Sequence, residues 1–183
     1  MTASRKKVIL RKFGPSSTAG ALRSSREWMA GYASFGDLED EGQLRLLDLE
    51  GKVLRIPLDE VKWLCFVRDF NSGEPGNPER LIRKQFSARP RQEGIWIRMT
   101  LADGDDLEGL ASNDKSLFEG SGLILTPPDV RSNTQRIYLP HAAILQLAVA
   151  GVILPPAAKP TKPVKTTYPG LFGEPEKKLE GEE

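Results

Sequence analysis

Residues 55–64 read RIPLDEVKWL, and residues 136–145 read RIYLPHAAIL. The Arg, the Ile and both Leu positions of these stretches coincide at a constant offset of 81 residues, from 55 to 136. Upstream, residues 31–34 (GYAS) are similar to residues 109–112 (GLAS). Because several matches occur in the same order, we infer that the chain contains two copies of one small unit.

Each copy is expected to form five short strands, because apolar and polar residues alternate in short runs and residues typical of turns lie at the ends of these runs. Residues 142–151 leave a helix open as an alternative, since Ala and Leu favour it. The equivalent residues 63–67 (WLCFV) are aromatic and β-branched and favour a strand. The predicted strands cover residues 7–13, 28–34, 43–48, 53–57 and 61–68 in the first copy, and 94–101, 106–111, 123–126, 136–139 and 143–149 in the second.

The fold class that this pattern predicts is mainly β, with two tandem five-stranded small β-barrels. The first barrel is expected to span residues 1–68 and the second residues 94–154, joined by a linker at 69–93. Short helical turns are expected between the fourth and fifth strands of each copy. Residues 155–183 are rich in Pro and Lys and then acidic, which predicts a disordered tail.

Residues 99–110, MTLADGDDLEGL, resemble the first motif of the Sm-like fold, in which an apolar strand, an Asp-Gly turn and a second Gly follow one another. The resemblance implies that Gly31 and Gly109 lie where a strand curls sharply to close a small barrel. SH3-like barrels share this pattern, so the expected class is Sm-like or SH3-like. The whole chain also resembles a group of uncharacterised bacterial tandem proteins with a VRDF-type segment, here at residues 67–70.

Sm proteins bind RNA through an Asp/Asn loop after strand two and an Arg-Gly loop between strands four and five. In this chain Asn113 and Asp114 lie near the first of these positions. The second loop carries no Arg-Gly, and its counterpart in the first copy contains Asp59 and Glu60. Acidic side chains oppose phosphate, so the resemblance does not carry RNA binding over to these loops.

The overall charge does not direct the protein towards nucleic acid or anionic lipid. The 183 residues include 26 basic and 25 acidic side chains, a net charge of +1. The single cysteine, Cys65, has no partner for an internal disulfide, which is typical of a reducing compartment. The basic N-terminus lacks a following apolar region, so no signal peptide is expected and the expected location is cytoplasmic.

Motifs of catalysis, metal binding and cofactor binding are absent from the sequence, so we expect no enzyme activity, no metal and no cofactor. There is no Gly-x-Ser-x-Gly, no paired Cys and only one histidine, His141, which we interpret as a surface or capping residue. Cys65 is interpreted as a core thiol. The acidic clusters at residues 37–41 and 103–106 are interpreted as solvated turn charges.

Basic residues gather at the N-terminus, in residues 5–12, and in the linker, and the linker is a candidate binding segment because basic residues with an interleaved aromatic ring can hold a phosphate backbone and stack a base. The same residues are compatible with a phosphorylated partner, a cyclic dinucleotide or a merely solvated linker. The candidate contact residues are Arg80, Arg83, Lys84, Phe86, Arg89 and Arg91.

The leading functional hypothesis is a non-catalytic binding or adaptor module that contacts a protein partner or another copy through its strand edges. The alternative is binding of RNA or single-stranded nucleic acid through the basic linker and the N-terminus. No small-molecule substrate and no membrane partner are expected.

Overall fold

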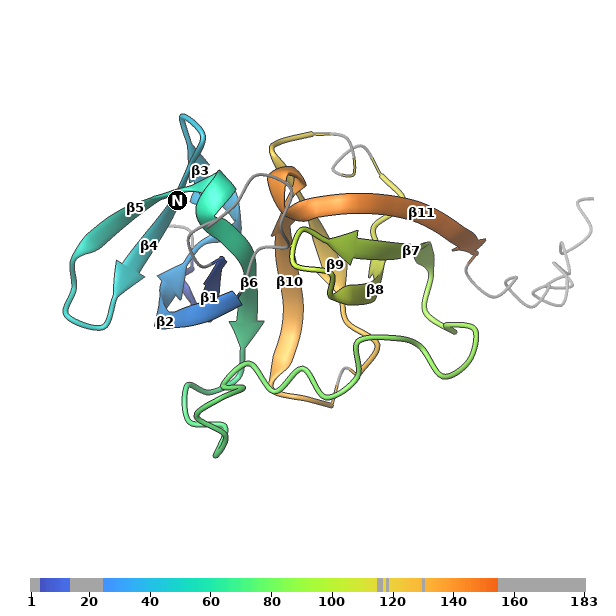
Figure 1. Cartoon of the computed structure of the whole chain (residues 1–183), viewed down its shortest axis with the longest axis horizontal. Helices are drawn as coiled ribbons and strands as arrows, with labels where there is room; N and C mark the ends of the chain where they lie inside the picture. Colours follow the sequence, from blue (N-terminus) through green and yellow to red (C-terminus); the bar gives the residue numbers. More distant parts are fainter. Residues whose placement is uncertain (1–3, 14–24, 115–116, 118, 130, 155–183) are drawn as a thin grey trace, which may run out of the picture.

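The computed structural model describes residues 4–13, 25–114, 117, 119–129 and 131–154, which are mainly β-strands without an α-helix (Figure 1). Short 3-10 turns are η1 (Phe35–Asp37), η2 (Leu58–Glu60) and η4 (His141–Ala143). The first copy contains β1 (Lys6–Phe13), β2 (Ser25–Ala33), β3 (Glu39–Asp40), β4 (Gln43–Asp48), β5 (Val53–Pro57) and β6 (Val61–Val67). The second contains β7 (Gly94–Leu101), β8 (Asp106–Ala111), β9 (Gly122–Thr126), β10 (Thr134–Pro140) and β11 (Ile144–Ile153).

The prediction of a mainly β fold is confirmed. The bounds of β4, β5, β7 and β8 agree with the sequence prediction, because each of these strands ends at a turn. Residues 144–153 form a strand, so the helical alternative for this segment is wrong. The tail at residues 155–183, predicted to be disordered, lies outside the described residues.

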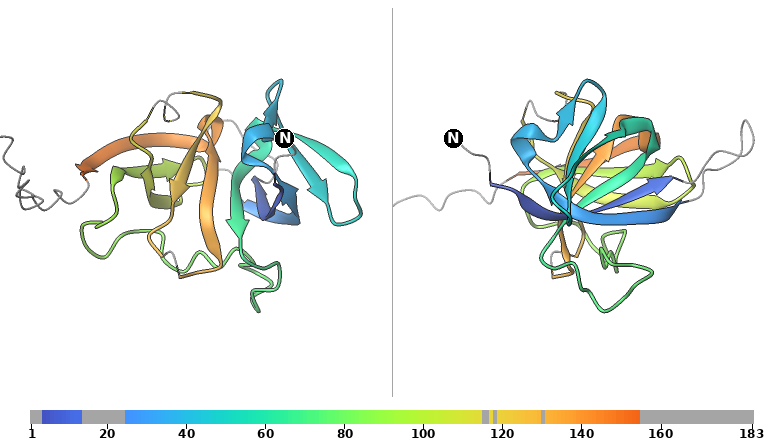
Figure 2. Two further views of the ribbon diagram at one scale, coloured as in Figure 1. Left: turned by 180° about the vertical axis from the view of Figure 1, so that it is seen from behind. Right: turned by 90° about the vertical axis from the view of Figure 1, so that its left-hand side faces the viewer.

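All strands belong to one antiparallel sheet with the order β11-β7-β8-β9-β10-β6-β1-β2-β4-β3, and β5 pairs with β4. The first copy has the internal order β6-β1-β2-β4-β5, and the second has the same order, β11-β7-β8-β9-β10. Two separate closed barrels are therefore not confirmed. The sheet is open, because β6 pairs with β10 of the other copy and joins the two copies side by side (Figure 2).

The structural repeat has an offset of 83 residues at its best-matched elements. The turn η2 begins at Leu58 and η4 at His141, while β6 begins at Val61 and β11 at Ile144. The offset of 81 predicted from the sequence is thus wrong by two residues. The offset of 81 matches similar residues within β5 and β10. Because a shift of two residues leaves side chains on the same face of a strand, the apolar pattern does not reveal the error.

Strand β6 lies between two hydrophobic clusters. Leu64 and Phe66 pack in the cluster of the first copy, which Tyr138 of β10 completes. Trp63 and Cys65 pack in the cluster formed largely by the second copy. Because neighbouring residues of a strand point to opposite faces, β6 is buried over its whole length and reads as a nearly continuous apolar run.

Tyr138 also makes a polar contact across the junction of the two copies. Its hydroxyl and the carboxylate of Glu39 form a hydrogen bond, and Glu39 also accepts a 3.1 Å hydrogen bond from the backbone N–H of Ser121. Burial, and then the bond to Glu39, raises the pKa of Tyr138. The tyrosine therefore stays a neutral donor that links β3 to β10.

The predicted bending glycines occupy equivalent places in the two copies. Gly31 is paired with Val8, and Gly109 is paired with Ile97. A Cβ at Gly31 would lie 2.5 Å from the carbonyl oxygen of Leu47. Because real Cβ atoms do not approach a backbone oxygen so closely, only glycine lets β2 and β4 pack at this point.

No helix in the described part of the chain has the length and apolar character needed to cross a membrane.

Candidate functional site

The linker between the copies is bound to the sheet rather than free. The side chain of Asn133 donates hydrogen bonds to the backbone oxygens of Asp69 (2.7 Å) and Pro78 (3.0 Å). Thr134 donates to the backbone oxygen of Glu79 at 2.6 Å. Both donors precede or begin β10, so the linker is fixed at the junction of the two copies.

The second half of the linker is held by β8. The backbone N–H of Glu108 donates to the carbonyl oxygen of Lys84 at 2.6 Å, and the carboxylate of Glu108 accepts from the N–H of Phe86 at 3.0 Å. The same carboxylate accepts hydrogen bonds from Trp96 and Arg98 of β7. Glu108 is buried, so the three donors to its carboxylate satisfy a charge that would otherwise be costly to bury.

Glu79 of the linker forms a buried ion pair with β1. Arg11 donates to its two carboxylate oxygens at 2.6 and 2.8 Å, and the indole N–H of Trp63 donates at 3.3 Å. The hydrogen bond to Glu79 raises the pKa of Arg11 against the effect of burial. A two-point pair of this kind fixes orientation as well as charge.

A second buried ion pair joins the two copies directly. Lys62 of β6 is 1% exposed, and its ammonium contacts the carboxylates of Asp103 and Asp105 in the turn between β7 and β8. Lys84 of the linker lies 2.8 Å from Asp105. Burial opposes the charge of Asp105, but hydrogen bonds from Lys62 and Lys84 lower its pKa. We call Arg11, Lys62, Glu79, Lys84, Asp103 and Asp105 the ionic cluster.

The ionic cluster has as many cations as carboxylates, and its members face one another. The ammonium of Lys62 also lies 4.3 Å from the ring centre of Trp63, a favourable cation–π contact. A cavity of about 240 Å³ borders the cluster. Because the charges are paired within the cluster, we assign it the role of fastening the linker and the two copies together.

The cluster corrects the interpretation of the acidic turn at residues 103–106 as solvated. The side chain of Asp103 is 7% exposed, and its carboxylate binds Lys62, which is 41 residues away in the sequence. A sequence signal for this pair exists in Lys62 itself, a lone cation inside the apolar run VKWLCFV. A lysine in a buried strand needs an acidic partner.

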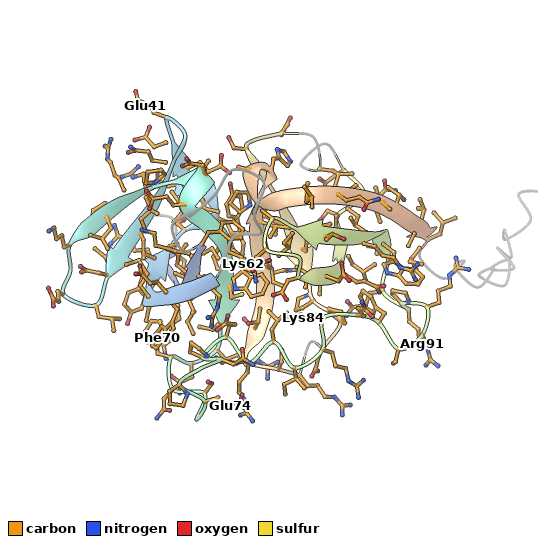
Figure 3. All side chains as sticks on the ribbon, viewed as in Figure 1. Glu41, Lys62, Phe70, Glu74, Lys84 and Arg91 are labelled. Carbon is orange, nitrogen blue, oxygen red and sulfur yellow. The ribbon has the colours of Figure 1, made fainter. Side chains whose placement is uncertain are left out.

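The candidate contact residues of the linker fall into two groups. Arg80 lies 3.5 Å from Glu74, and Lys84 belongs to the ionic cluster, so these two cations have partners within the protein. Figure 3 shows Lys84 beside Lys62 and Arg91 well away from both. The second group lines a shallow groove of about 260 Å³ with Pro127 and Pro128, and consists of Arg83, Phe86, Arg89 and Arg91.

Phe86, the aromatic residue of this groove, already contacts a neighbouring ring. Phe86 makes an edge-on contact with Trp96, with ring centres 6.0 Å apart. Arg83, Arg89 and Arg91 are exposed. The groove therefore offers three accessible guanidinium groups beside an apolar wall, which is suited to an anion.

The two ends of the sheet present free strand edges among the residues that the structure describes. In this part of the chain, β11 pairs only with β7 at one end and β5 pairs only with β4 at the other (Figure 1). The segment from β11 to Leu154 exposes more large apolar side chains than any other part of the described chain. They are Leu145 (68%), Leu147 (45%), Val149 (59%), Val152 (46%) and Leu154 (71%).

Two other residues interpreted from the sequence, Cys65 and His141, lie in the core and at the surface, respectively. Cys65 is a fully buried core thiol, as predicted, and burial raises its pKa well above the usual value. His141 is exposed at the start of η4, as predicted. Within the described ranges, no group of three or more His, Cys, Asp or Glu residues is arranged to hold a metal ion.

Comparison with known proteins identifies one family. The model of a family of unknown function, DUF6982, matches residues 4–151 of this chain. No curated protein and no solved structure matches.

Proposed function

The chain belongs to DUF6982, a family of unknown function, and we propose that it is a non-catalytic binding or adaptor module that contacts a protein partner through the free edge of β11. The observation that carries this proposal is the exposure of Leu145, Leu147 and Val149 on a strand whose outer edge pairs with no other strand of the described residues. An unpaired edge offers a row of backbone donors and acceptors, and another strand can add to it.

The composition of β11 supports the proposal that a partner covers this edge in the functioning protein. Natural edge strands are protected by charged residues, Pro, β-bulges or short length. Of these, β11 has register shifts in its ladder with β7, between Ile144 and Gln146 and between Val149 and Gly151. Strand β11 is ten residues long, ILQLAVAGVI, and contains no charged residue and no Pro. A long apolar edge is an aggregation hazard unless a partner occupies it, and this favours a binding role.

We also propose that each copy is a small barrel of the Sm-like or SH3-like class that stays open at its edge. The short turns η2 and η4 between the last two strands of each copy support this class, as do the bending glycines Gly31 and Gly109. An adaptor built from such units needs no catalytic group and no cofactor.

A photo-crosslinking amino acid at Leu147 tests the proposed role in cells that express the full chain. We expect an adduct of defined mass that mass spectrometry identifies as a protein, and we expect Val149→Lys to abolish it. The matched control is the same crosslinker at Ile82, an apolar linker residue that is 61% exposed. If Leu147 gives no protein adduct, or gives the same adducts as Ile82, the proposal is wrong.

The groove of Arg83, Arg89 and Arg91 favours a second function, the binding of RNA or single-stranded nucleic acid. Fluorescence anisotropy with mixed-sequence single-stranded RNA at low and near-physiological salt tests it. Micromolar binding that weakens steeply with salt would place this function first, because phosphate contacts release counterions. Absence of binding at low salt would remove it.

A further inference from the structure

The junction between the two copies shows how one unit of this fold binds another. Strand β10 pairs antiparallel with β6, with Arg136 opposite Phe66, Ile137 opposite Cys65 and Tyr138 opposite Leu64. The pairing leaves Leu64, Phe66 and Tyr138 at most 3% exposed. A strand that precedes the 3-10 turn of one copy thus covers the strand that follows the 3-10 turn of the other.

The two free ends of the sheet are the repeat equivalents of this junction. Strand β5 corresponds to β10, because each precedes the 3-10 turn of its copy, and β11 corresponds to β6, because each follows it. One chain therefore carries both halves of the junction a second time, at opposite ends of its sheet (Figure 1). The halves cannot meet within one molecule without breaking the sheet that separates them.

Burial differs between the equivalent strands as the absence of a neighbour predicts. Leu64 is fully buried, whereas its equivalent Leu147 is 45% exposed. Phe66 is 3% exposed, whereas its equivalent Val149 is 59% exposed. On the opposite edge Val53 of β5 is 50% exposed. The β11 end of the sheet therefore exposes apolar side chains at the positions that the internal junction covers, and the β5 end exposes the apolar side chain of Val53.

We propose that the partner of the β11 edge is a second copy of this chain, whose β5 pairs antiparallel with β11 as β10 pairs with β6. This inference rests on the proposed function and names its partner. Transfer of the internal register places Val53 opposite Val149 and Arg55 opposite Leu147. The partner edge is thus complementary in direction and register, and Val53 supplies an apolar contact.

The association is head-to-tail, because the two edges that meet are different. A heterologous contact of this type either closes into a ring or continues as a filament. It leaves the groove of Arg83, Arg89 and Arg91 on every copy, since that groove lies on the linker and β9 side of the molecule rather than on β5 or β11.

Disulfide trapping between two purified variants tests the register. Paired residues of an antiparallel ladder have Cα atoms about 4.5–5.5 Å apart, within the range that a disulfide spans. We expect Val53→Cys and Val149→Cys proteins to form a mixed disulfide dimer on mild oxidation, and neither variant to form its own dimer readily. The matched control replaces Val149→Cys by Leu145→Cys, which is equally accessible but four residues out of register.

Light scattering and sedimentation of the unmodified full chain measure the association itself. We expect the mass to rise with concentration up to about 100 μM, which populates interfaces with micromolar Kd. Val149→Lys should keep the protein a monomer, because a charge on the edge opposes pairing. Ile82→Lys, a change of the same kind on the linker, should leave the association unchanged.

Each contrary outcome is informative. A monomer at every concentration together with no trapped dimer would overturn self-association. The proposed function would survive that result if Leu147 still crosslinks a different protein in cells, and would fail with it if Leu147 crosslinks nothing. A dimer trapped by Val149→Cys alone would show a symmetric contact between two β11 edges and would overturn the head-to-tail arrangement.

Discussion

The ammonium of Lys62 on β6 lies 2.5 Å from the carboxylate of Asp105 in the turn between β7 and β8. The two residues belong to different copies of the repeat, and Lys62 is almost fully buried. Removal of one partner from a buried ion pair leaves an uncompensated charge in the interior. The stability of the junction between the copies should therefore depend on this contact.

We predict that Lys62→Met lowers the free energy of unfolding by about 3 kcal/mol, the usual cost of breaking a buried pair. Chemical denaturation measures the change. Lys7→Met is the matched control, since the pair of Lys7 with Asp69 is exposed and should contribute little to stability. Equal effects of the two substitutions would contradict a structural role for the ionic cluster.

A pH dependence follows from Asp105. Because its pKa is lowered in the folded protein by Lys62 and Lys84, its ionised form favours folding. The contribution is fully present above the pKa of the unfolded chain, about 3.9, and is lost as pH falls through the lower pKa of the folded state. We expect the stability difference between the wild type and Asp105→Asn to be constant near neutrality and to shrink in acid below that range.

Denaturation of both proteins between neutral and acidic pH measures this difference. In a background with Lys62→Met and Lys84→Met the dependence should disappear or reverse, because burial then acts on the carboxylate without the cations that lower its pKa. A difference that grows as the pH falls would have the wrong sign and would contradict the assignment.

The bend of β2 gives a prediction on packing. Gly31→Ala should destabilise the protein by about 1–3 kcal/mol or more, because the new Cβ would meet the carbonyl oxygen of Leu47 at 2.5 Å. Gly36→Ala is the control, since a Cβ there meets no atom within 4 Å. Thermal unfolding compares the two, and a Gly31→Ala protein as stable as the control would mean that the strands can separate at this point.

The exposed arginines of the groove should contribute little to the stability of the fold. Changing Arg83, Arg89 and Arg91 together to Gln should alter stability by no more than about 0.5 kcal/mol, as is usual for exposed sites. Lys84→Met should destabilise more, because Lys84 is paired with Asp105. Any RNA binding should be lost in the triple variant, and retention of full affinity would exclude the groove as its site.

The local structure was predictable from the sequence where turn residues bound a strand. Strands β4, β5, β7 and β8 are examples, because their ends depend on nearby residues. Strand β3, Glu39–Asp40, was not predicted, since two residues carry no alternation. The repeat was also visible, although similar residues in β5 and β10 shifted its offset by two.

The long-range arrangement was not predictable in the same way. The sequence predicts strands with free edges, but no local pattern predicts that β6 pairs with β10. Likewise, Lys62 and Asp105 are 43 residues apart, so no local pattern pairs them. The sequence therefore predicts a free basic linker, whereas two of its cations have acidic partners: Arg80 lies near Glu74 of the linker itself, and Lys84 lies near Asp105 of the second copy.

Cys65 offers a test of whether the two copies unfold as one unit. It is fully buried, and it lies opposite Ile9 of the first copy and Ile137 of the second, so it is exposed only when the shared sheet opens. Burial also raises the pKa of its thiol, which disfavours the reactive thiolate.

We expect a thiol reagent to modify native Cys65 slowly, with a free energy of opening equal to that of global unfolding from denaturation. An exposed cysteine from Val53→Cys should react at once and serves as the control for the reagent. If Cys65 reacts through an opening that costs much less than global unfolding, then β6 and β10 separate while each copy stays folded. In that case the junction is a reversible contact between independent units rather than part of a single cooperative core.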